Sequence, residues 1–171
     1  MAKVIWLTGL SGVGKTTLSK KINFFLKRKN KCLIIDGDTF RKKNKQYSFS
    51  KKNIIKNNLQ IINFCKKNFS KYDYIIVSVI SPLKKTRIYA HKIFDKNYFE
   101  IYLFASIKIL EKRDTKGLYA LSKKGVIRNL IGHRSKINYE KSNHKHLRIN
   151  TNILSLQKSL KKILKYAKIN L

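Results

Sequence analysis

Gly9-Leu10-Ser11-Gly12-Val13-Gly14-Lys15-Thr16 is the stretch that decides the fold. It directly follows the apolar run Val4-Ile5-Trp6-Leu7, and a segment with helical spacing of its apolar residues begins at Lys15. A glycine-rich loop between a strand and a helix is typical of a phosphate-binding loop, because the turning backbone points its N–H groups toward phosphate oxygens. The helix adds the positive end of its dipole. This context favours a nucleotide triphosphate site over an ordinary glycine-rich turn.

The residue types of this loop match the chemistry of a bound triphosphate. Glycines at positions 9, 12 and 14 let the backbone turn, Lys15 reaches the β and γ phosphates, and Thr16 ligates Mg²⁺. We therefore expect ATP and Mg²⁺ as cofactors. The residues of this region that are expected to bind ATP are Gly9, Leu10, Ser11, Gly12, Val13, Gly14, Lys15, Thr16 and Thr17.

Length and composition limit the class of protein. The 171 residues suit a single domain, and a hydrophobic content of 43% is typical of a folded protein. The net charge is +32, but lysines are spread along the whole chain and no known nucleic-acid module is evident. We therefore expect no specific nucleic acid partner. A basic, nucleotide-regulated nucleic-acid-binding protein is the alternative from another class.

Cysteine usage indicates a reducing compartment, and hydropathy indicates a chain without a membrane span. Cys32 and Cys65 lack metal-ligand spacing, so we expect two reduced, buried thiols. No apolar run approaches the roughly 18 residues needed to span a bilayer, and the glycine loop interrupts the short N-terminal run. The expectation is a cytoplasmic protein without a membrane partner.

Apolar runs alternate with longer helical patterns along the chain. Strands are predicted at Lys3–Thr8, Lys31–Asp36, Tyr74–Val79 and Phe99–Phe104. Helices are predicted at Lys15–Lys29, Lys51–Phe69, Lys84–Phe94, Ser106–Arg113 and Leu154–Ile169. Such alternation predicts repeated βαβ units. The expected fold class is α/β, a P-loop NTPase-type three-layer α/β/α arrangement with a mostly parallel sheet over residues 1–171.

This topology predicts where ligands bind. In open α/β sheets they bind beyond the carboxyl ends of the strands, where the glycine loop, Asp36–Asp38 and Ser78–Ser81 would all emerge. These three segments should therefore line one cleft. Residues 114–147, the lid segment, show little periodicity and are rich in Lys, Gly, Asn and His. We expect the lid segment to be a mobile cover.

Four further motifs follow the glycine loop in order. They are Asp36-Gly37-Asp38-Thr39-Phe40-Arg41, Ser48-Phe49-Ser50, Ile80-Ser81-Pro82 with Arg87, and Arg113-Asp114-Thr115-Lys116-Gly117-Leu118-Tyr119. With this order the chain resembles adenylylsulfate kinases from about Val4 to Thr151. The resemblance implies a P-loop kinase that uses ATP and Mg²⁺ to phosphorylate the 3′-hydroxyl of a nucleotide whose 5′ phosphate carries a sulfate. It also implies a homodimer.

The two aspartates after the second strand suit phosphoryl transfer. A ribose hydroxyl needs a carboxylate to orient it and accept its proton, while Lys15 and Mg²⁺ neutralise charge on the transferred group. We assign Asp38 to the acceptor hydroxyl and Asp36 to the metal or its waters, and the two roles are exchangeable at this stage. The alternative is that one of the aspartates only caps a helix.

The resemblance also implies an acceptor site. Its residues are Asp38, Arg41, Phe49, Asn57, Ile80, Ser81, Lys116, Gly117 and Leu118. A structural role is expected for Ser81, because transfer to a bound acceptor needs no covalent enzyme intermediate. Arg113 either contacts ATP phosphates or pairs with Asp114. Tyr139-Glu140 matches a Tyr-Glu pair of the family near the end of the lid segment.

Two departures from the family concern the acceptor. Ile54 stands where the family has an arginine, and Leu130 stands where it has the second of two phenylalanines that stack on the acceptor purine. Losing a bidentate cation and an aromatic ring suggests a different acceptor. We therefore expect the chain to resemble most the cytidine diphosphoramidate kinases of capsule phosphoramidate biosynthesis. A genuine adenylylsulfate kinase of sulfate activation is the alternative.

Overall fold

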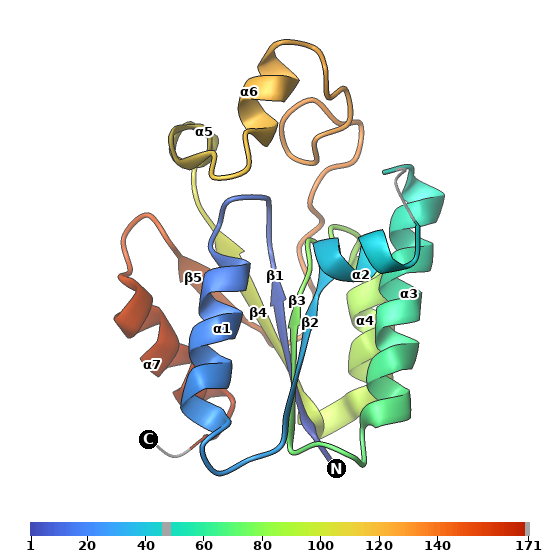
Figure 1. The fold of residues 1–171 in the computed structure, drawn as a ribbon, viewed down its shortest axis with the longest axis vertical. Helices are drawn as coiled ribbons and strands as arrows, with labels where there is room; N and C mark the ends of the chain where they lie inside the picture. The colour runs from blue at the N-terminus through green and yellow to red at the C-terminus, as the bar shows by residue number, and fades with distance from the viewer. Residues whose placement is uncertain (46–48, 170–171) are drawn as a thin grey trace.

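Five parallel strands form one sheet in the computed structural model, which describes residues 1–45 and 49–169. In sheet order they are β2 (Cys32–Asp36), β3 (Tyr74–Ser78), β1 (Lys3–Thr8), β4 (Tyr98–Phe104) and β5 (Leu147–Asn150). Every neighbouring pair is parallel. The expected parallel sheet is confirmed, and Figure 1 shows it at the centre of the molecule.

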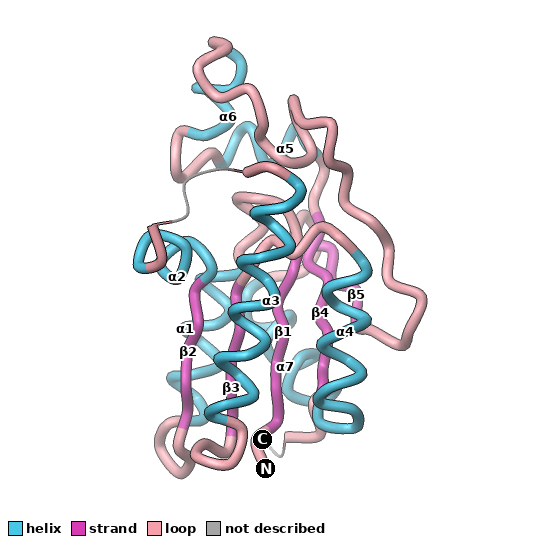
Figure 2. Tube along the Cα trace, turned by 90° about the vertical axis from the view of Figure 1, so that its right-hand side faces the viewer, coloured by secondary structure: helices cyan, strands magenta, loops and turns pink. Residues whose placement is uncertain are grey.

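Helices cover both faces of the sheet, as expected for three layers (Figures 1 and 2). One face packs against α1 (Lys15–Leu26) and α7 (Leu156–Tyr166), and the other packs against α3 (Lys51–Asn68) and α4 (Lys84–Phe94). The remaining helices are α2 (Gly37–Lys43), η1 (Asp95–Asn97), α5 (Ile107–Arg113) and α6 (Leu118–Lys123). Alternate residues of the central β1 serve both layers: Ile5 and Leu7 pack toward α1, and Val4 and Trp6 toward α3.

The predicted elements are present with boundary shifts of a few residues, but four elements were missed, namely α2, η1, α6 and β5. β5 has only four residues, and Ile149 is the one residue among them that is buried. So short a strand has almost no alternating hydrophobic pattern in its sequence. α2 is short and polar, and it occupies a stretch for which the sequence predicted no helix. α6 lies within the lid segment, which Figure 1 shows above the carboxyl end of the sheet.

Cys65 is buried as expected, but Cys32 is only partly buried. Cys32 and Cys65 are both free thiols, and burial raises the pKa of the Cys65 thiol. Among the described residues, no helix is both long and apolar enough to cross a membrane. The cytoplasmic location, the single-domain organisation and the mobility of the lid segment stay predictions.

The glycine loop passes very close to the neighbouring strand β4. Gly9 has a φ of +140°, and a Cβ added to it would lie 2.1 Å from the carbonyl oxygen of Leu103 and 3.2 Å from Cγ2 of Val13. A side chain at this position would therefore clash with rigid backbone as well as strain φ. Gly125, in the lid segment, also has a positive φ of +77°, but a Cβ there would meet nothing within 4 Å.

This contrast gives a matched pair of substitutions. Gly9→Ala should lower the free energy of unfolding by about 3 kcal/mol or more, because strain and steric overlap add. Gly125→Ala should cost about 1 kcal/mol, because only strain contributes. Urea denaturation of both variants measures the difference. Equal losses of stability would contradict the close approach of the loop to β4.

Candidate active site

A cavity of about 610 Å³ opens at the carboxyl end of the sheet. Its size is in the range of small-molecule and cofactor sites. The predicted site residues that line it are Ser11, Gly12, Val13, Gly14, Lys15, Thr16, Thr17, Asp36, Asp38, Arg41, Phe49, Ile80, Ser81, Arg113, Lys116 and Leu118. Gly9, Leu10, Asn57 and Gly117 are not part of its lining. The structure thus brings the three expected segments to one cleft.

The glycine loop has the geometry of an anion cradle. Gly12 and Gly14 have φ values of +77° and +93°, which glycine adopts without strain, and α1 begins directly after Gly14. The Lys15 ammonium folds back and donates hydrogen bonds to the carbonyl oxygens of Gly9 at 2.9 Å and Leu10 at 2.7 Å. Burial lowers the pKa of Lys15 to about 8, and the charge of Asp38 only partly offsets this effect.

Asp36 joins the glycine loop to α2. Its Oδ2 accepts a hydrogen bond from the Thr16 hydroxyl at 2.9 Å. Its Oδ1 accepts hydrogen bonds from the backbone N–H groups of Asp38 at 3.1 Å and Thr39 at 3.2 Å, so Asp36 is the N-cap of α2. Asp36 therefore both caps α2 and contacts the glycine loop. The sequence pattern did not reveal α2 because a polar helix of seven residues has no apolar face to detect.

Thr16 and Asp36 fit a magnesium ion. Both present hard oxygen atoms next to the phosphate cradle, and Mg²⁺ is usually held by one or two protein oxygens together with substrate phosphates and water. Within residues 1–45 and 49–169 there is no group of three or more His, Cys, Asp or Glu side chains that could hold a metal. A metal at this place would accordingly take most of its ligands from the nucleotide and water.

Asp38 faces the lid segment. Its Oδ2 forms an ion pair with the ammonium of Lys116, and both side chains are about half exposed. Burial tends to raise the pKa of Asp38, but the hydrogen bond and charge of Lys116, with the charges of Lys15 and Arg41, outweigh burial and hold the pKa below its usual value. Asp38 is therefore ionised at neutral pH.

Arg41 and Phe49 form the outer wall of the cavity. The Arg41 guanidinium lies over the Phe49 ring at 4.6 Å, and the Phe49 side chain is 42% exposed. A half-open aromatic ring of this kind can stack on a planar base. Ser48, which belongs to the same motif, lies outside the described residues.

The helix α3 contributes Asn58 where Asn57 was expected. Asn57 is completely buried and does not line the cavity, whereas Asn58 does, one helical turn after Ile54. Asn58 donates from Nδ2 to the Ile54 carbonyl at 2.8 Å, and its Oδ1 is buried without a protein partner among the described residues. The hydroxyl of Ser78, also in the lining, has none either. Buried polar atoms cost free energy when unpaired, so a bound molecule or water should satisfy both.

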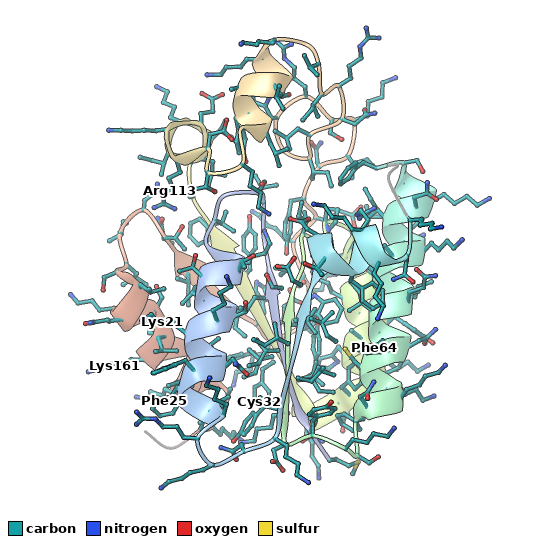
Figure 3. The ribbon with its side chains drawn as sticks, in the orientation of Figure 1. Lys21, Phe25, Cys32, Phe64, Arg113 and Lys161 are labelled. Atoms are coloured by element: carbon teal, nitrogen blue, oxygen red, sulfur yellow. The ribbon has the colours of Figure 1, made fainter. Side chains whose placement is uncertain are left out.

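Arg113 forms no ion pair with Asp114 among the described residues, and its expected contact with ATP phosphates stays a prediction. Its guanidinium donates to the hydroxyl of Thr151 at 3.1 Å and to the Thr151 carbonyl at 2.6 Å, which ties the end of α5 to the residue after β5. Figure 3 labels Arg113. Asp114 instead accepts hydrogen bonds from the N–H groups of Tyr119 at 3.1 Å and Ala120 at 2.9 Å and so caps α6. Arg113 still borders the cavity.

Tyr139 and Glu140 lie behind the cavity wall. The Tyr139 hydroxyl is 2.9 Å from the hydroxyl of Thr8 at the end of β1. Glu140 accepts a hydrogen bond at 2.7 Å from the backbone N–H of Lys84 at the start of α4. The pair therefore anchors the returning chain of the lid segment to the sheet and to α4.

Comparisons with known proteins agree with this geometry. The profile of the family described as adenylylsulphate kinase matches residues 1–150. A probable adenylyl-sulfate kinase of Pyrococcus abyssi is 42% identical over 131 residues, which cover 75% of each chain. An adenylyl-sulfate kinase of Bacteroides thetaiotaomicron is 35% identical over 164 residues, covering 94% of this chain and 81% of the relative. The APS kinase of Mycobacterium tuberculosis, solved in complex with AMPPNP and APS, superimposes with a TM-score of 0.84 at 25% identity over 98% of both chains.

These similarities overturn the expectation of a cytidine diphosphoramidate kinase of capsule biosynthesis, which was wrong. The family profile and the curated relatives are those of adenylyl-sulfate kinases. Packing explains the two residues that suggested otherwise. Ile54 is 1% exposed and packs against Leu83 and Ile131, and Leu130 is 7% exposed and belongs to the core around β1. Both residues also line the cavity, so their apolar character suits the core and the cavity wall together.

The lowered pKa of Lys15 predicts how nucleotide binding depends on pH. Above about pH 8 the free protein loses the proton of Lys15. Because triphosphate binding favours the charged ammonium, the complex must then take up a proton, and affinity for AMPPNP should fall by up to about tenfold per pH unit. Calorimetric titration at pH 7 and pH 9.5 measures this fall.

The control is Lys15→Arg, whose guanidinium stays charged over this range. Its affinity for AMPPNP should change little between the two pH values. Proton uptake, measured at pH 9.5 in two buffers of different ionisation enthalpy, should approach one proton for the wild type and vanish for the variant. A wild-type affinity that is flat with pH would contradict the role of Lys15.

Proposed function

The chain belongs to the adenylylsulphate kinase family and is an ATP-dependent nucleotide 3′-kinase, and from this premise we propose that its acceptor is adenylylsulfate. The product of that reaction is 3′-phosphoadenylylsulfate. The observation that carries the proposal is one cavity lined by the phosphate loop, by Asp38 and by the Ile80-Ser81 turn. A donor triphosphate and an acceptor sugar hydroxyl can meet only where these groups share one space.

On the donor side, the loop residues bind the ATP phosphates through backbone N–H groups at the start of α1. Lys15 exchanges the carbonyl oxygens of Gly9 and Leu10 for the phosphate oxygens. Its ammonium then offsets the negative charge on the transferred group. In this proposal Arg113, at the cavity border, contacts the ATP phosphates.

A magnesium ion, held by Thr16 and by Asp36 or its waters, would supply further charge neutralisation at the phosphates. Asp36 is the N-cap of α2 through Oδ1 and accepts from the Thr16 hydroxyl through Oδ2, so its carboxylate keeps one orientation. That rigidity leaves Asp36 unsuited to following a substrate proton. The structure therefore favours the assignment of Asp38, and not Asp36, to the acceptor hydroxyl.

On the acceptor side, Asp38 receives the 3′-hydroxyl after Lys116 releases the carboxylate. The hydroxyl proton passes to Asp38 as the O3′–P bond forms, and the bond from the γ-phosphorus to ADP breaks with its electron pair leaving on ADP. Arg41 suits the oxygens of the phosphosulfate group, and the Phe49 ring suits one face of the adenine. Ser81 has a structural role. The homodimer and the closing of the lid segment stay predictions.

Purified protein tests the acceptor directly. With ATP, Mg²⁺ and adenylylsulfate, equal amounts of ADP and 3′-phosphoadenylylsulfate should form, as separated by ion-exchange chromatography. The analogue 3′-deoxyadenylylsulfate lacks the accepting oxygen and should yield no phosphorylated product. Consumption of ATP without loss of adenylylsulfate, or phosphorylation of the deoxy analogue, would exclude the proposed reaction.

Asp38→Asn tests the assigned base. The amide keeps the size of the side chain but accepts a proton poorly, so turnover should fall by about 10²-fold or more. AMPPNP affinity should stay within about twofold, because the phosphate cradle is untouched. Asp95→Asn, at η1 below the sheet, is the matched control and should retain wild-type turnover. An active Asp38→Asn enzyme would show that another group takes the proton.

A further inference from the structure

Arg87 is a buried cation that the proposed chemistry does not use. It lies in the first turn of α4 and is 0% exposed. Its Nη1 donates to the carbonyl oxygen of Ser81, and its Nη2 donates to the carbonyl oxygen of Glu140. The face of the guanidinium lies over the Tyr139 ring at 4.7 Å. One side chain thus connects the acceptor turn of the cavity with the returning end of the lid segment.

Glu100 of β4 holds this guanidinium in place. It is 1% exposed, and its Oε1 accepts from Arg87 Nε at 3.2 Å and from the Ser142 hydroxyl at 2.5 Å. Its Oε2 lies 2.9 Å from His144 Nε2 and 3.5 Å from the Tyr98 hydroxyl. Every oxygen of the buried carboxylate is therefore satisfied, which fixes the carboxylate and the guanidinium in one geometry.

The turn that Arg87 grips is strained. Ser81 has a φ of +41°, a region that residues with a side chain rarely adopt, and it is 1% exposed. The preceding carbonyl, that of Ile80, accepts a hydrogen bond from the Thr8 hydroxyl, which in turn contacts the Tyr139 hydroxyl. Strained backbone of this kind persists where surrounding contacts over-determine it. Here these contacts come from Arg87 and from Thr8 with Tyr139.

We propose that Arg87, with Glu100 as its counter-charge, is a positioning residue for the acceptor nucleotide, setting the Ile80-Ser81 turn against the end of the lid segment. This inference rests on the proposed function. Burying an ion pair is costly, and apolar residues of similar volume often give equal stability. The pair is thus better explained by the geometry it imposes on two carbonyl groups than by a gain in stability. Among the described residues, Arg87 and Glu100 make no hydrogen bond to the phosphate loop. The turn itself meets the loop at its first residue, where the Gly9 N–H donates to the Ile80 carbonyl at 3.5 Å, so we expect a smaller effect on the donor site than on the acceptor site.

Arg87→Met tests the inference, since it keeps volume and removes both backbone contacts. The KM for adenylylsulfate should rise about tenfold or more, because a small displacement of the Ile80-Ser81 turn weakens binding of the acceptor. The KM for ATP and the affinity for AMPPNP should stay within about twofold of the wild type. Phe94→Leu, at the far end of the same helix, is the matched control for lost stability. It should lower the thermal midpoint without changing either KM.

Tyr139→Phe is a milder variant in case Arg87→Met does not fold. It keeps the ring under Arg87, loses only the contact with Thr8, and should raise the KM for adenylylsulfate alone. An unchanged adenylylsulfate KM in both variants, or equal rises for both nucleotides, would overturn the inference.

Hydrogen exchange separates this inference from the proposed function. In Arg87→Met or Tyr139→Phe, amide exchange should speed up at residues 79–83 and 138–142 and stay unchanged at residues 11–16, which have no hydrogen bond to the turn among the described residues. That result is expected even if the wild type does not turn over adenylylsulfate. Unchanged exchange at residues 79–83 in a folded variant would show that Arg87 does not hold the turn.

Discussion

Parallel pairing of β1 with β3 on one side and β4 on the other is the constraint on which the site depends. It places the carboxyl ends of the strands at one edge, so that the glycine loop after β1, Asp36 at the end of β2 and the turn after β3 face a common cavity. The contact of Gly9 with the Leu103 carbonyl fixes how closely the loop sits on β4. The position of the phosphate cradle is therefore a property of the sheet.

Much of this arrangement was predictable because its signals are local. The glycine loop, the apolar runs of the first four strands and the paired aspartates each occur within a few consecutive residues. The rule that ligands bind beyond the carboxyl ends of parallel strands then predicts the shared cleft. The contacts of Asp36 with Thr16 and with the start of α2 refine that prediction and distinguish the two aspartates, which sequence spacing alone did not do.

The rest depends on burial, which spacing does not reveal. Ile54 and Leu130 were interpreted as altered acceptor contacts; both line the cavity, but they also fill core positions, which accounts for their apolar character. Which of Asn57 and Asn58 faces the cavity depends on the exact rotation of α3 about its axis. The four residues of β5 pair with β4 only because the tertiary fold brings the two strands together. Arg87 and Glu100 are likewise 13 positions apart, and their partner Ser142 is more distant still. No short sequence motif therefore reveals that these three side chains are in contact.

A crystal structure with AMPPNP and adenylylsulfate bound tests the central claim most directly. The account predicts that an Asp38 carboxylate oxygen lies within about 3 Å of the 3′-hydroxyl, with Lys116 released from Asp38 and Lys15 on the phosphates. A bound pair of nucleotides whose 3′-hydroxyl is remote from Asp38, with the Asp38–Lys116 ion pair intact, would contradict it.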